Sequence, residues 1–501
     1  MFVDPSGRLT MGPRRSLFEM AHHVHFIGIG GVGMSGIAHI LLSLGHRISG
    51  SDLRDHETVG QLRRRGAMVY VGHDGANLGD ADVVVVSSAV PGSNPEVVAA
   101  VARHIPVIPR AEMLAELMRL KYGIAVAGAH GKTTTTSILA VLLEGGGLDP
   151  TVVVGGRVKG AGYGGARLGR GEVLLAEADE SDGSFLTLSP VVGVVTNVDD
   201  EHLDHYGSAE ALEAAFVAFC NRIPFFGLTA LNLDDPRVAR LLPRVRKRVR
   251  TFGTSPQANL RILPLTDGGG APQAFQLVED GADLGVFHLH APGRHNLYNA
   301  AAAIAVGRFL EIEVEVLRAA LLRYQGVGRR FERLFAGGGV ELVDDYGHHP
   351  TEIAATLATA RGYWPGRIVA LVQPHRYSRL AALAEQFTTC LLAADVCLIT
   401  RVYSAGESRG TGPDGAELCR LLHRHGHRDV HFCTDLPSLE TAALEVVRPG
   451  DLLLTLGAGD ITRLAHRLAD RLPAHLRIPT SPGPPPERHP GTADRGAGTR
   501  D

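Results

Sequence analysis

The sequence predicts an α/β protein built from three domains in series, and three observations lead to this fold class. The chain has 501 residues, which at about 150 residues per domain corresponds to about three domains. Short apolar runs alternate with helical patterns, an order that predicts parallel sheets with helices on both faces. The 61 glycines are scattered rather than periodic and 45% of the residues are hydrophobic, which excludes collagen-like and largely disordered chains.

The first domain is expected over residues 1–121. Apolar and β-branched runs predict strands, and longer patterns with helical spacing predict helices between them. The strands are expected at 22–29, 47–51, 68–71 and 83–86, and the helices at 35–44 and 58–65.

The second domain is expected over residues 122–333, where the alternation starts again. A polar, hairpin-like insert is expected around 255–290. The strands are expected at 122–127, 152–154, 172–176 and 191–197, and the helices at 135–143, 209–221 and 296–310.

The third domain is expected over residues 334–478, with apolar helices between its strands. These strands are expected at 340–344, 368–372, 396–400 and 452–456. From 479 to 501 the chain is rich in Pro, Gly, Thr and Arg and has almost no apolar residue. This composition predicts a disordered tail.

Charge and cysteine content limit the possible partners. A net charge of −3 gives no support for bulk binding to nucleic acid or to an anionic membrane. The five cysteines contain no Cys-x-x-Cys pair, which argues against a disulfide framework and favours a reducing cytoplasm. Residues 26–44 are almost free of polar side chains, but five glycines among them indicate a strand, turn and helix rather than a signal peptide or membrane span. We therefore expect a cytoplasmic protein without membrane insertion, present as a monomer or weak homodimer.

A first glycine-rich loop follows the first predicted strand and opens a helix. Its glycines are Gly28, Gly30, Gly31 and Gly33, and Asp52 ends the next strand about twenty residues later. Glycines let the backbone approach a diphosphate, and the acid can bind a ribose hydroxyl. The loop predicts a nucleotide diphosphate, which on this motif alone is either NAD or a UDP-sugar.

A second glycine-rich loop follows the strand at 122–127. Only four of the fifty basic residues are lysines, and one of them stands where a phosphate loop needs an ammonium group. The next hydroxyl is placed to ligate Mg²⁺. We therefore predict ATP binding by Gly128, Ala129, His130, Gly131, Lys132, Thr133 and Thr134.

Acidic residues and a histidine follow two strands of the same domain. Glu177 is the first acid after one strand, and His202 follows a cluster of acids after the next. Because the carboxyl ends of parallel strands lie beside the phosphate loop, these groups are placed to hold a divalent metal against ATP.

Polar residues also cluster at 295–299, 329–330, 344–352 and 373–379. The two histidines and two aspartates within 344–352 suit a transition-metal site, a His–Asp catalytic pair, or ordinary capping and turn chemistry. Their concentration at strand ends favours a function.

These motifs resemble those of the Mur ligases of peptidoglycan synthesis. The matching segments lie at 28–38, 128–136, 177–185, 197–206, 295–306, 328–331, 344–352 and 373–379, and span roughly residues 22–475. The resemblance implies three domains: a Rossmann-like N-terminal domain, a central P-loop ATPase domain and a Rossmann-like C-terminal domain. It implies an ATP-dependent ligase that joins L-alanine to the lactyl carboxylate of UDP-N-acetylmuramate through an acyl phosphate.

The resemblance also implies residue roles. The first loop, with Asp52, would bind the UDP-sugar and not NAD. Thr133, Glu177 and His202 would hold Mg²⁺, and His295, Asn296 and Asn299 would contact adenine. Catalytic roles would fall to Lys132, His202, Arg330, Asp345 and His348, and alanine or product binding to Tyr346, His348, Arg376 and Arg379.

The sequence departs from the family pattern in the phosphate loop, where Ala129 replaces the usual threonine. No lysine lies between His202 and Lys247, so we expect no carbamylated lysine of the kind found in ligases that add later residues. The nearest alternative is the recycling ligase that attaches a ready-made tripeptide to the same UDP-sugar. An NAD-dependent oxidoreductase and a nucleotide-switch protein are alternatives from other classes.

Overall fold

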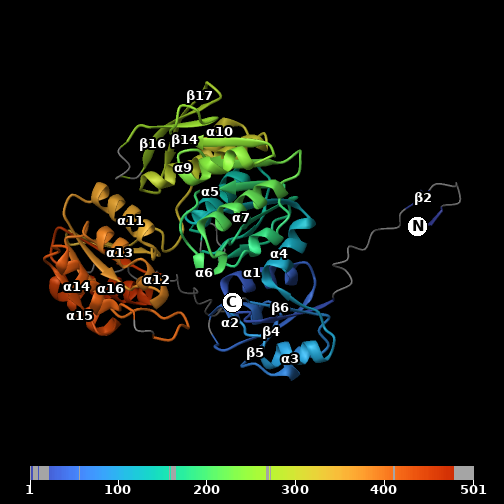
Figure 1. Cartoon of the computed structure of the whole chain (residues 1–501), viewed down its shortest axis with the longest axis horizontal. Helices are drawn as coiled ribbons and strands as arrows, with labels where there is room; N and C mark the ends of the chain where they lie inside the picture. Colours follow the sequence, from blue (N-terminus) through green and yellow to red (C-terminus); the bar gives the residue numbers. More distant parts are fainter. Residues whose placement is uncertain are drawn as a thin grey trace, which may run out of the picture.

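The structure is a computed structural model that describes residues 2–3, 9–10 and 22–478, except 56, 88, 157, 160–164, 267–269, 271 and 410–411. The tail predicted at 479–501 lies outside the described residues. Three large sheets form three lobes, shown in blue, in teal to yellow, and in orange to red (Figure 1). Strands β1 (Phe2–Val3) and β2 (Leu9–Thr10) form a separate antiparallel pair.

The first domain contains a five-stranded parallel sheet in the order β5-β4-β3-β6-β7. Its strands are β3 (His23–Ile27), β4 (Arg47–Asp52), β5 (Met68–Val71), β6 (Val83–Val86) and β7 (Val107–Pro109). Its helices are α1 (Val32–Ser43), α2 (Glu57–Arg64), η2 (Gly75–Leu78), α3 (Pro95–Ala102) and α4 (Arg110–Arg119).

The central domain contains a ten-stranded sheet in the order β10-β9-β11-β8-β12-β13-β14-β15-β16-β17. Its strands are β8 (Tyr122–Ala127), β9 (Thr151–Val153), β10 (Ala166–Arg167), β11 (Val173–Glu177), β12 (Val192–Val195), β13 (Leu228–Asn232), β14 (Val249–Gly253), β15 (Leu260–Pro264), β16 (Gln273–Glu279) and β17 (Ala282–Leu289). Its helices are α5 (Lys132–Gly145), η3 (Ser184–Thr187), α6 (Leu203–Tyr206), α7 (Ala209–Arg222), α8 (Pro236–Leu241), η4 (Leu242–Arg244), α9 (Arg294–Phe309) and α10 (Val314–Leu322).

The third domain contains a six-stranded sheet in the order β18-β19-β23-β20-β21-β22, parallel except for the edge strand β18. Its strands are β18 (Glu332–Gly337), β19 (Val340–Asp345), β20 (Arg367–Val372), β21 (Val396–Ile399), β22 (Val430–Phe432) and β23 (Asp451–Leu456). Its helices are α11 (Pro350–Tyr363), α12 (Tyr377–Ala382), α13 (Ala384–Leu391), α14 (Gly415–Arg424), α15 (Leu436–Val446) and α16 (Ile461–His475).

The strand order places both glycine-rich loops at topological switch points. Strand β3 lies between β4 and β6, and β8 lies between β11 and β12. The strands that follow β3 in sequence are therefore added first on one side of it and later on the other, and the same holds for β8. Crevices at such points are where open α/β sheets bind ligands. The predicted α/β class is confirmed, with parallel pairing at the centre of all three large sheets.

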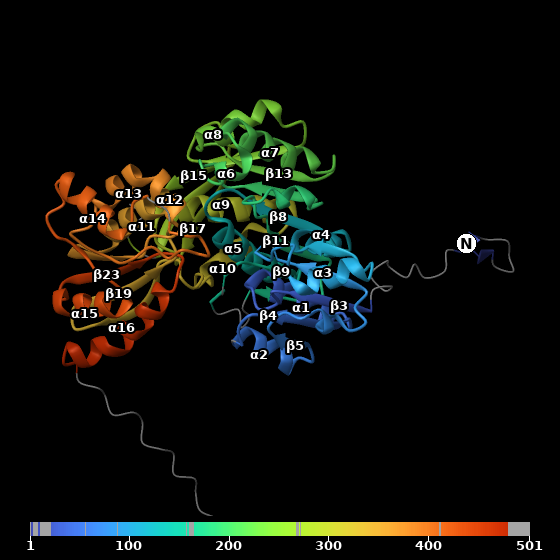
Figure 2. The same ribbon diagram turned by 60° about the horizontal axis from the view of Figure 1, so that its bottom comes forward.

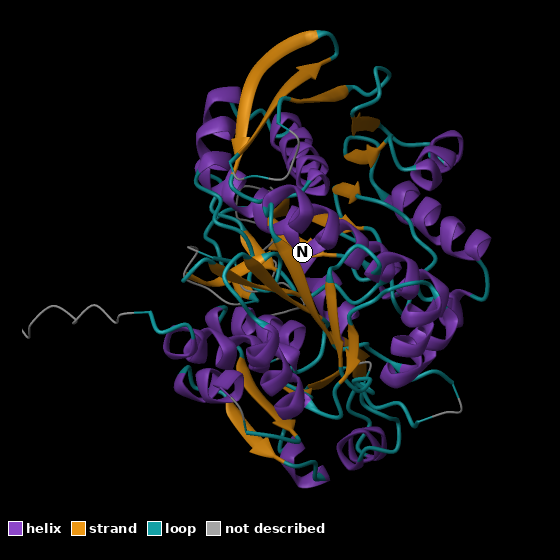
Figure 3. Cartoon of the chain, turned by 90° about the vertical axis from the view of Figure 1, so that its left-hand side faces the viewer, coloured by secondary structure: helices purple, strands orange, loops and turns teal. Residues whose placement is uncertain are grey.

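The region predicted as a hairpin-like insert does contain a hairpin, formed by β16 and β17, and this hairpin extends the central sheet. Strands β15, β16 and β17 pair antiparallel with one another, and β15 continues the sheet in parallel with β14. Figure 3 shows the two long strands β16 and β17 at the top of the molecule. Phe275 and Phe287 stack face to face between these strands and join the core that covers one face of the central sheet.

The third domain lies beside the central one in both views (Figures 1 and 2). Thr351 at the start of α11 donates a hydrogen bond of 2.7 Å to Asp199, which follows β12. The helices of the described chain all fall short of the length and apolarity that a membrane crossing requires.

Candidate active site

The phosphate loop joins β8 to α5 and is held by the end of the neighbouring strand β12. Gly128 and Gly131 have φ angles of +131° and +83°, which glycine adopts without the steric cost that a side chain adds. Asn197 accepts a hydrogen bond from the backbone N–H of His130 at 2.8 Å and donates one to its carbonyl at 2.9 Å. The loop is therefore fixed in shape before a nucleotide arrives.

Lys132 folds back over this loop. Its ammonium donates to the carbonyls of Gly128 and Ala129 at 2.6 and 3.1 Å, and to both carboxylate oxygens of Glu180 at 2.8 Å. Burial by itself lowers the pKa of Lys132, but Glu180 and Asp179 raise it above its ordinary value. Lys132 is therefore a charged cation, and an arriving phosphate group can replace Glu180 as its partner.

The three residues expected to hold Mg²⁺ fall into two neighbouring groups. Thr133 and Glu177 form one group: burial raises the pKa of Glu177, the Thr133 hydroxyl counters this shift, and Oε1 of Glu177 is buried without a hydrogen-bond partner. His202 instead lies 3.9 Å from both Glu180 and Glu201, and their ligand atoms lie within 4.8 Å of one another. Carboxylate and hydroxyl oxygens around an unpartnered carboxylate oxygen fit a hard divalent cation.

A cavity of about 380 Å³ opens between the central and third domains. It is lined by the predicted residues His130, Gly131, Thr134, His295, Asn296, Asn299, Arg330 and Asp345. Tyr298, Tyr324 and Phe252 add aromatic surface, which suits a nucleobase and its ribose. The cavity therefore brings together residues that are up to about 200 positions apart in the sequence.

The first turn of α9 forms one wall of this cavity. Asn299 accepts from the Thr135 hydroxyl at 3.2 Å and donates to Asn296 at 3.0 Å, which fixes both amides. Burial, followed by the charge of Arg330, lowers the pKa of His295 to about 4. His295 is therefore a neutral imidazole at neutral pH and offers both a donor and an acceptor.

Arg330 and Asp345 reach the cavity from the start of the third domain. The Arg330 guanidinium lies 5.1 Å from the centre of the Tyr346 ring and 3.4 Å from Glu352. Asp345 accepts the backbone N–H groups of Phe331 at 2.7 Å and Gly347 at 2.8 Å. In this structure Asp345 shapes the turn that carries the polar residues of 344–352.

The four residues expected at the amino-acid site are not all brought together. Tyr346 and His348 stack edge to face with ring centres 5.2 Å apart. Arg379 lies 3.7 Å from Glu201, and its Nη1 is buried without a partner, which leaves a donor for a carboxylate. Arg376 faces Glu407 at 3.9 Å, with its side chain nearly half exposed.

The glycine loop of the first domain is closed by the end of β4. The backbone N–H groups of Gly28 and Ile29 donate to the Ser51 carbonyl at 2.8 and 3.0 Å. Asp52 accepts from the Gly30 N–H at 2.9 Å, so in this structure it braces the loop itself. Contact with a ribose stays a prediction for Asp52.

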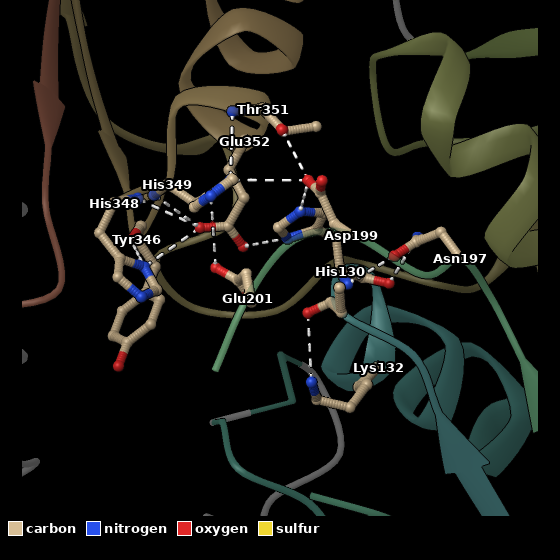
Figure 4. Close-up of polar contacts among 12 residues, drawn as sticks. His130, Lys132, Asn197, Asp199, Glu201, Tyr346, His348, His349, Thr351 and Glu352 are labelled. Atoms are coloured by element: carbon tan, nitrogen blue, oxygen red, sulfur yellow. Dashed lines mark hydrogen bonds and ion pairs between the residues drawn. The ribbon is translucent and has the colours of Figure 1, made fainter. Parts of the chain in front are cut away.

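The structure adds residues to the site to which the sequence analysis gave no individual role. Figure 4 shows His130 and Asp199 of the central domain facing Thr351, Glu352 and His349 of the third domain. The additional residues are Asp199, Glu180, Glu201, His349, Glu352, His375 and Arg110. Most lie beside residues that were selected, but a position in a run of acids or histidines does not reveal which side chain points inward. Arg110, which lies against Gly33 and 3.6 Å from Asp179, had no sequence signal.

The fold and site together define a three-domain nucleotide-dependent enzyme, with a phosphate loop facing a polar cluster on a separate domain. Three family models match the chain: "Mur ligase family, catalytic domain" over residues 23–122, "Mur ligase middle domain" over 126–307, and "Mur ligase, glutamate ligase domain" over 329–459. The chain belongs to the Mur ligase family. This membership argues against the oxidoreductase and the nucleotide switch.

Similar proteins agree with this assignment. The UDP-N-acetylmuramate--L-alanine ligase of Myxococcus xanthus is 51% identical over 93% of this chain and 98% of its own length. The crystal structure of the UDP-N-acetylmuramate-alanine ligase MurC from Thermotoga maritima has a TM-score of 0.77 and 30% identity, and covers 90% of this chain and 99% of its own. A tripeptide ligase from Neisseria meningitides is 29% identical, covers 62% of this chain and 100% of its own, and has a TM-score of 0.57.

Proposed function

We propose that this protein is an ATP-dependent ligase that joins L-alanine to the lactyl carboxylate of UDP-N-acetylmuramate during peptidoglycan precursor synthesis. The observation that carries the proposal is the 51% identity over 93% of the chain to a relative named for this activity. The tripeptide alternative is weaker, because the two murein peptide ligase structures match at 21% and 29% identity with TM-scores of 0.68 and 0.57, against 0.77 for the MurC structure.

The reaction needs two glycine loops because it uses two phosphorylated substrates. The lactyl carboxylate attacks the γ-phosphate of ATP, which releases ADP and forms an acyl phosphate. The alanine amine then attacks the acyl carbon, and inorganic phosphate leaves from the tetrahedral intermediate. Such a sequence depends on positioning and on neutralising the charge of the phosphates.

The central domain would bind ATP and neutralise its charge. The loop at 128–134 would hold the phosphates, with Lys132 against the terminal ones in place of its contact with Glu180. His295, Asn296 and Asn299 would contact adenine in the cavity, and Arg330 and Asp345 would lie on the ATP side of the third domain. Thr133, Glu177 and His202 would hold Mg²⁺, which supplies further charge neutralisation when it is bound.

The other two substrates would bind in the outer domains. Gly28, Gly30, Gly31, Gly33 and Asp52 would hold the UDP diphosphate and ribose. Tyr346, His348, Arg376 and Arg379 would bind alanine and the product carboxylate, and the unpartnered Nη1 of Arg379 supports a carboxylate there.

The decisive assay measures phosphate release from ATP in the presence of UDP-N-acetylmuramate, with and without L-alanine. We expect fast release, and an amide product, only when both substrates are present. Substitution of the tripeptide for L-alanine tests the alternative ligase. Phosphate release that is no faster with both substrates than with either one would exclude the proposed activity.

We also propose a cytoplasmic location, where all three substrates would be at hand. All five cysteines are free thiols, as a reducing compartment favours. A monomer or weak homodimer remains our prediction, which sedimentation of the purified protein tests.

A further inference from the structure

Glu352 stands in the first turn of α11, where it completes a capping box with His349. Its Oε2 accepts the backbone N–H groups of His348 at 3.1 Å and His349 at 3.4 Å. Capping explains these two contacts, and a glutamine at this position fulfils the same role.

Three cationic or ionisable side chains also meet this carboxylate, and capping does not require them. His348 Nδ1 lies 3.1 Å from Oε2, while Arg330 and His130 Nδ1 lie 3.4 and 3.5 Å from Oε1. One oxygen therefore faces the expected amino-acid site and the other faces the phosphate loop of the neighbouring domain (Figure 4).

The pKa shifts of Glu352 and His130 indicate that these two groups form an ion pair. Burial by itself raises the pKa of Glu352, but the nearby His130, His348 and Arg330 side chains hold it well below its ordinary value. Burial lowers the pKa of His130, but Asp199 and Glu352 raise it to about 10. The carboxylate and the His130 imidazolium are therefore both charged at neutral pH.

The surroundings of His348 fix its tautomer. Its Nδ1 has two acceptors within reach, the Tyr346 carbonyl at 3.2 Å and Glu352 at 3.1 Å. Nδ1 therefore carries a hydrogen, so Nε2 is the acceptor in the singly protonated ring. The ring is also confined by edge-to-face contact with His375, at 5.4 Å between ring centres.

We propose that Glu352 is a positioning residue for the ligase reaction. It fixes His348 with the hydrogen on Nδ1 and with Nε2 free to accept an N–H of the amino acid. Through the same carboxylate it ties this histidine to His130 of the phosphate loop. The proposal rests on the proposed function, because only a ligase that uses an amino acid needs such an acceptor.

The test is the variant Glu352→Gln, which keeps an acceptor for the capping N–H groups and removes the charge. We expect the KM for L-alanine to rise about tenfold, the loss typical of a hydrogen bond to a charged group. The KM for UDP-N-acetylmuramate should change little, while the unfolding temperature should fall because the buried charges of Arg330 and His130 lose a partner. The matched control is Glu440→Gln, a buried glutamate of the same domain that binds Arg467 and Arg471 away from the site. It should leave both KM values unchanged.

A double-mutant cycle separates positioning from a general structural role. If Glu352 acts through His348, adding Glu352→Gln to His348→Gln should raise the KM for L-alanine no further. The proposal would be overturned if the KM increases of the two single variants multiply in the double variant. It would also be overturned if Glu352→Gln alone leaves the KM for L-alanine unchanged. If Glu352→Gln does not fold, Glu352→Asp keeps the charge with a shorter reach, and the same cycle applies to it. Wild-type protein that releases no alanine-dependent phosphate would instead overturn the ligase function.

Discussion

At the scale of single residues, the contact between Lys132 and Glu180 holds the lysine of the expected phosphate loop in place. The ammonium holds two loop carbonyls and a carboxylate that is almost fully buried. An isolated charge at this depth would be costly, so Glu180 stabilises the lysine in this position. The hydrogen bonds of Lys132 and Asn197 fix the shape of the loop.

The variant Lys132→Ala removes this cation. We expect turnover to fall by at least about a hundredfold, because a charge aimed at the transferred phosphoryl group acts mainly in the transition state. UDP-sugar affinity should change less than twofold, since that ligand is assigned to the first domain. Steady-state kinetics and calorimetric titration measure the two quantities. Lys247→Ala, just before β14, is the control and should leave both unchanged. Loss of both functions in Lys132→Ala would mean that the two glycine loops are assigned wrongly.

A buried acid in the first domain makes a prediction about pH. Glu96 is fully buried and accepts hydrogen bonds from Ser51 at 2.5 Å and Asn77 at 2.7 Å. Burial by itself raises its pKa, but His25, Ser51 and Asn77 lower it to about 2. Because the folded pKa is below the unfolded one, this group adds stability above the unfolded pKa and loses it as the pH falls toward 2.

The variant Glu96→Gln should therefore destabilise the first domain by a few kcal/mol at pH 7, and the difference from wild type should vanish between about pH 4.5 and 2. Hydrogen exchange of the β3 and β4 amides over this pH range measures the effect. Glu116→Gln, an exposed residue of α4 that pairs with Arg119, is the control. A penalty that stays constant down to pH 2 would contradict the ionised state of Glu96.

Residue type and position in the sequence select some candidate site residues, but they do not reveal side-chain orientation, which depends on the folded backbone. Lys132 was selected because lysine is rare in this chain and this one stands after a strand and a glycine, and its role stays a prediction. Glu180 lies in a run with Glu177, Asp179 and Asp182, in which only the folded backbone decides which carboxylate turns toward the lysine. A position in such a run predicts that a carboxylate can bind a cation, but it does not predict which way the side chain points.

At the scale of elements, buried regular strands were predictable and short or half-exposed ones were not. Strands β5 and β6 have the predicted bounds, 68–71 and 83–86. Strand β7 has three residues and ends in proline, so it lacks the length for a periodic signal. Strand β18 lies at the edge of its sheet and is only partly buried, so its hydrophobic pattern is weak.

The packing of α1 makes a prediction about glycine. A Cβ on Gly36 would lie 2.8 Å from the Cβ of Ala166 in β10, so Gly36→Ala should push α1 off the central domain and destabilise the protein by about 1–3 kcal/mol. Gly60 in α2 has only the end of the Arg64 side chain near its Cβ position, at 3.5 Å. Gly60→Ala should therefore stabilise the first domain by about 0.5–1 kcal/mol. Thermal unfolding measures both variants, and shifts of the same sign would contradict this account of α1 packing.

At the scale of the whole molecule, the candidate nucleotide cavity forms where the central and third domains meet. The cavity is lined from both, and Lys159 with Glu332 adds an ion pair at 2.9 Å between them. Sequence patterns describe each domain separately because they depend on local periodicity, whereas these contacts join residues that are more than a hundred positions apart. The order of the domains could therefore be predicted from the sequence, but the contact between His130 and Glu352 could not.

The junction itself can be tested through Thr351, whose hydroxyl donates to Asp199 at 2.7 Å across the domain boundary. The variant Thr351→Val keeps the side-chain shape and removes this hydrogen bond. Without nucleotide, the first-turn amides of α11 should exchange hydrogen faster, because one tie between the domains is lost. ATP affinity should fall about three- to tenfold, the loss expected for one typical hydrogen bond, while UDP-sugar affinity stays constant. Thr389→Val removes an exposed hydroxyl that bonds within α13 and serves as the control. Unchanged exchange at α11 in Thr351→Val would mean that the remaining interdomain ion pairs hold the third domain without this contact.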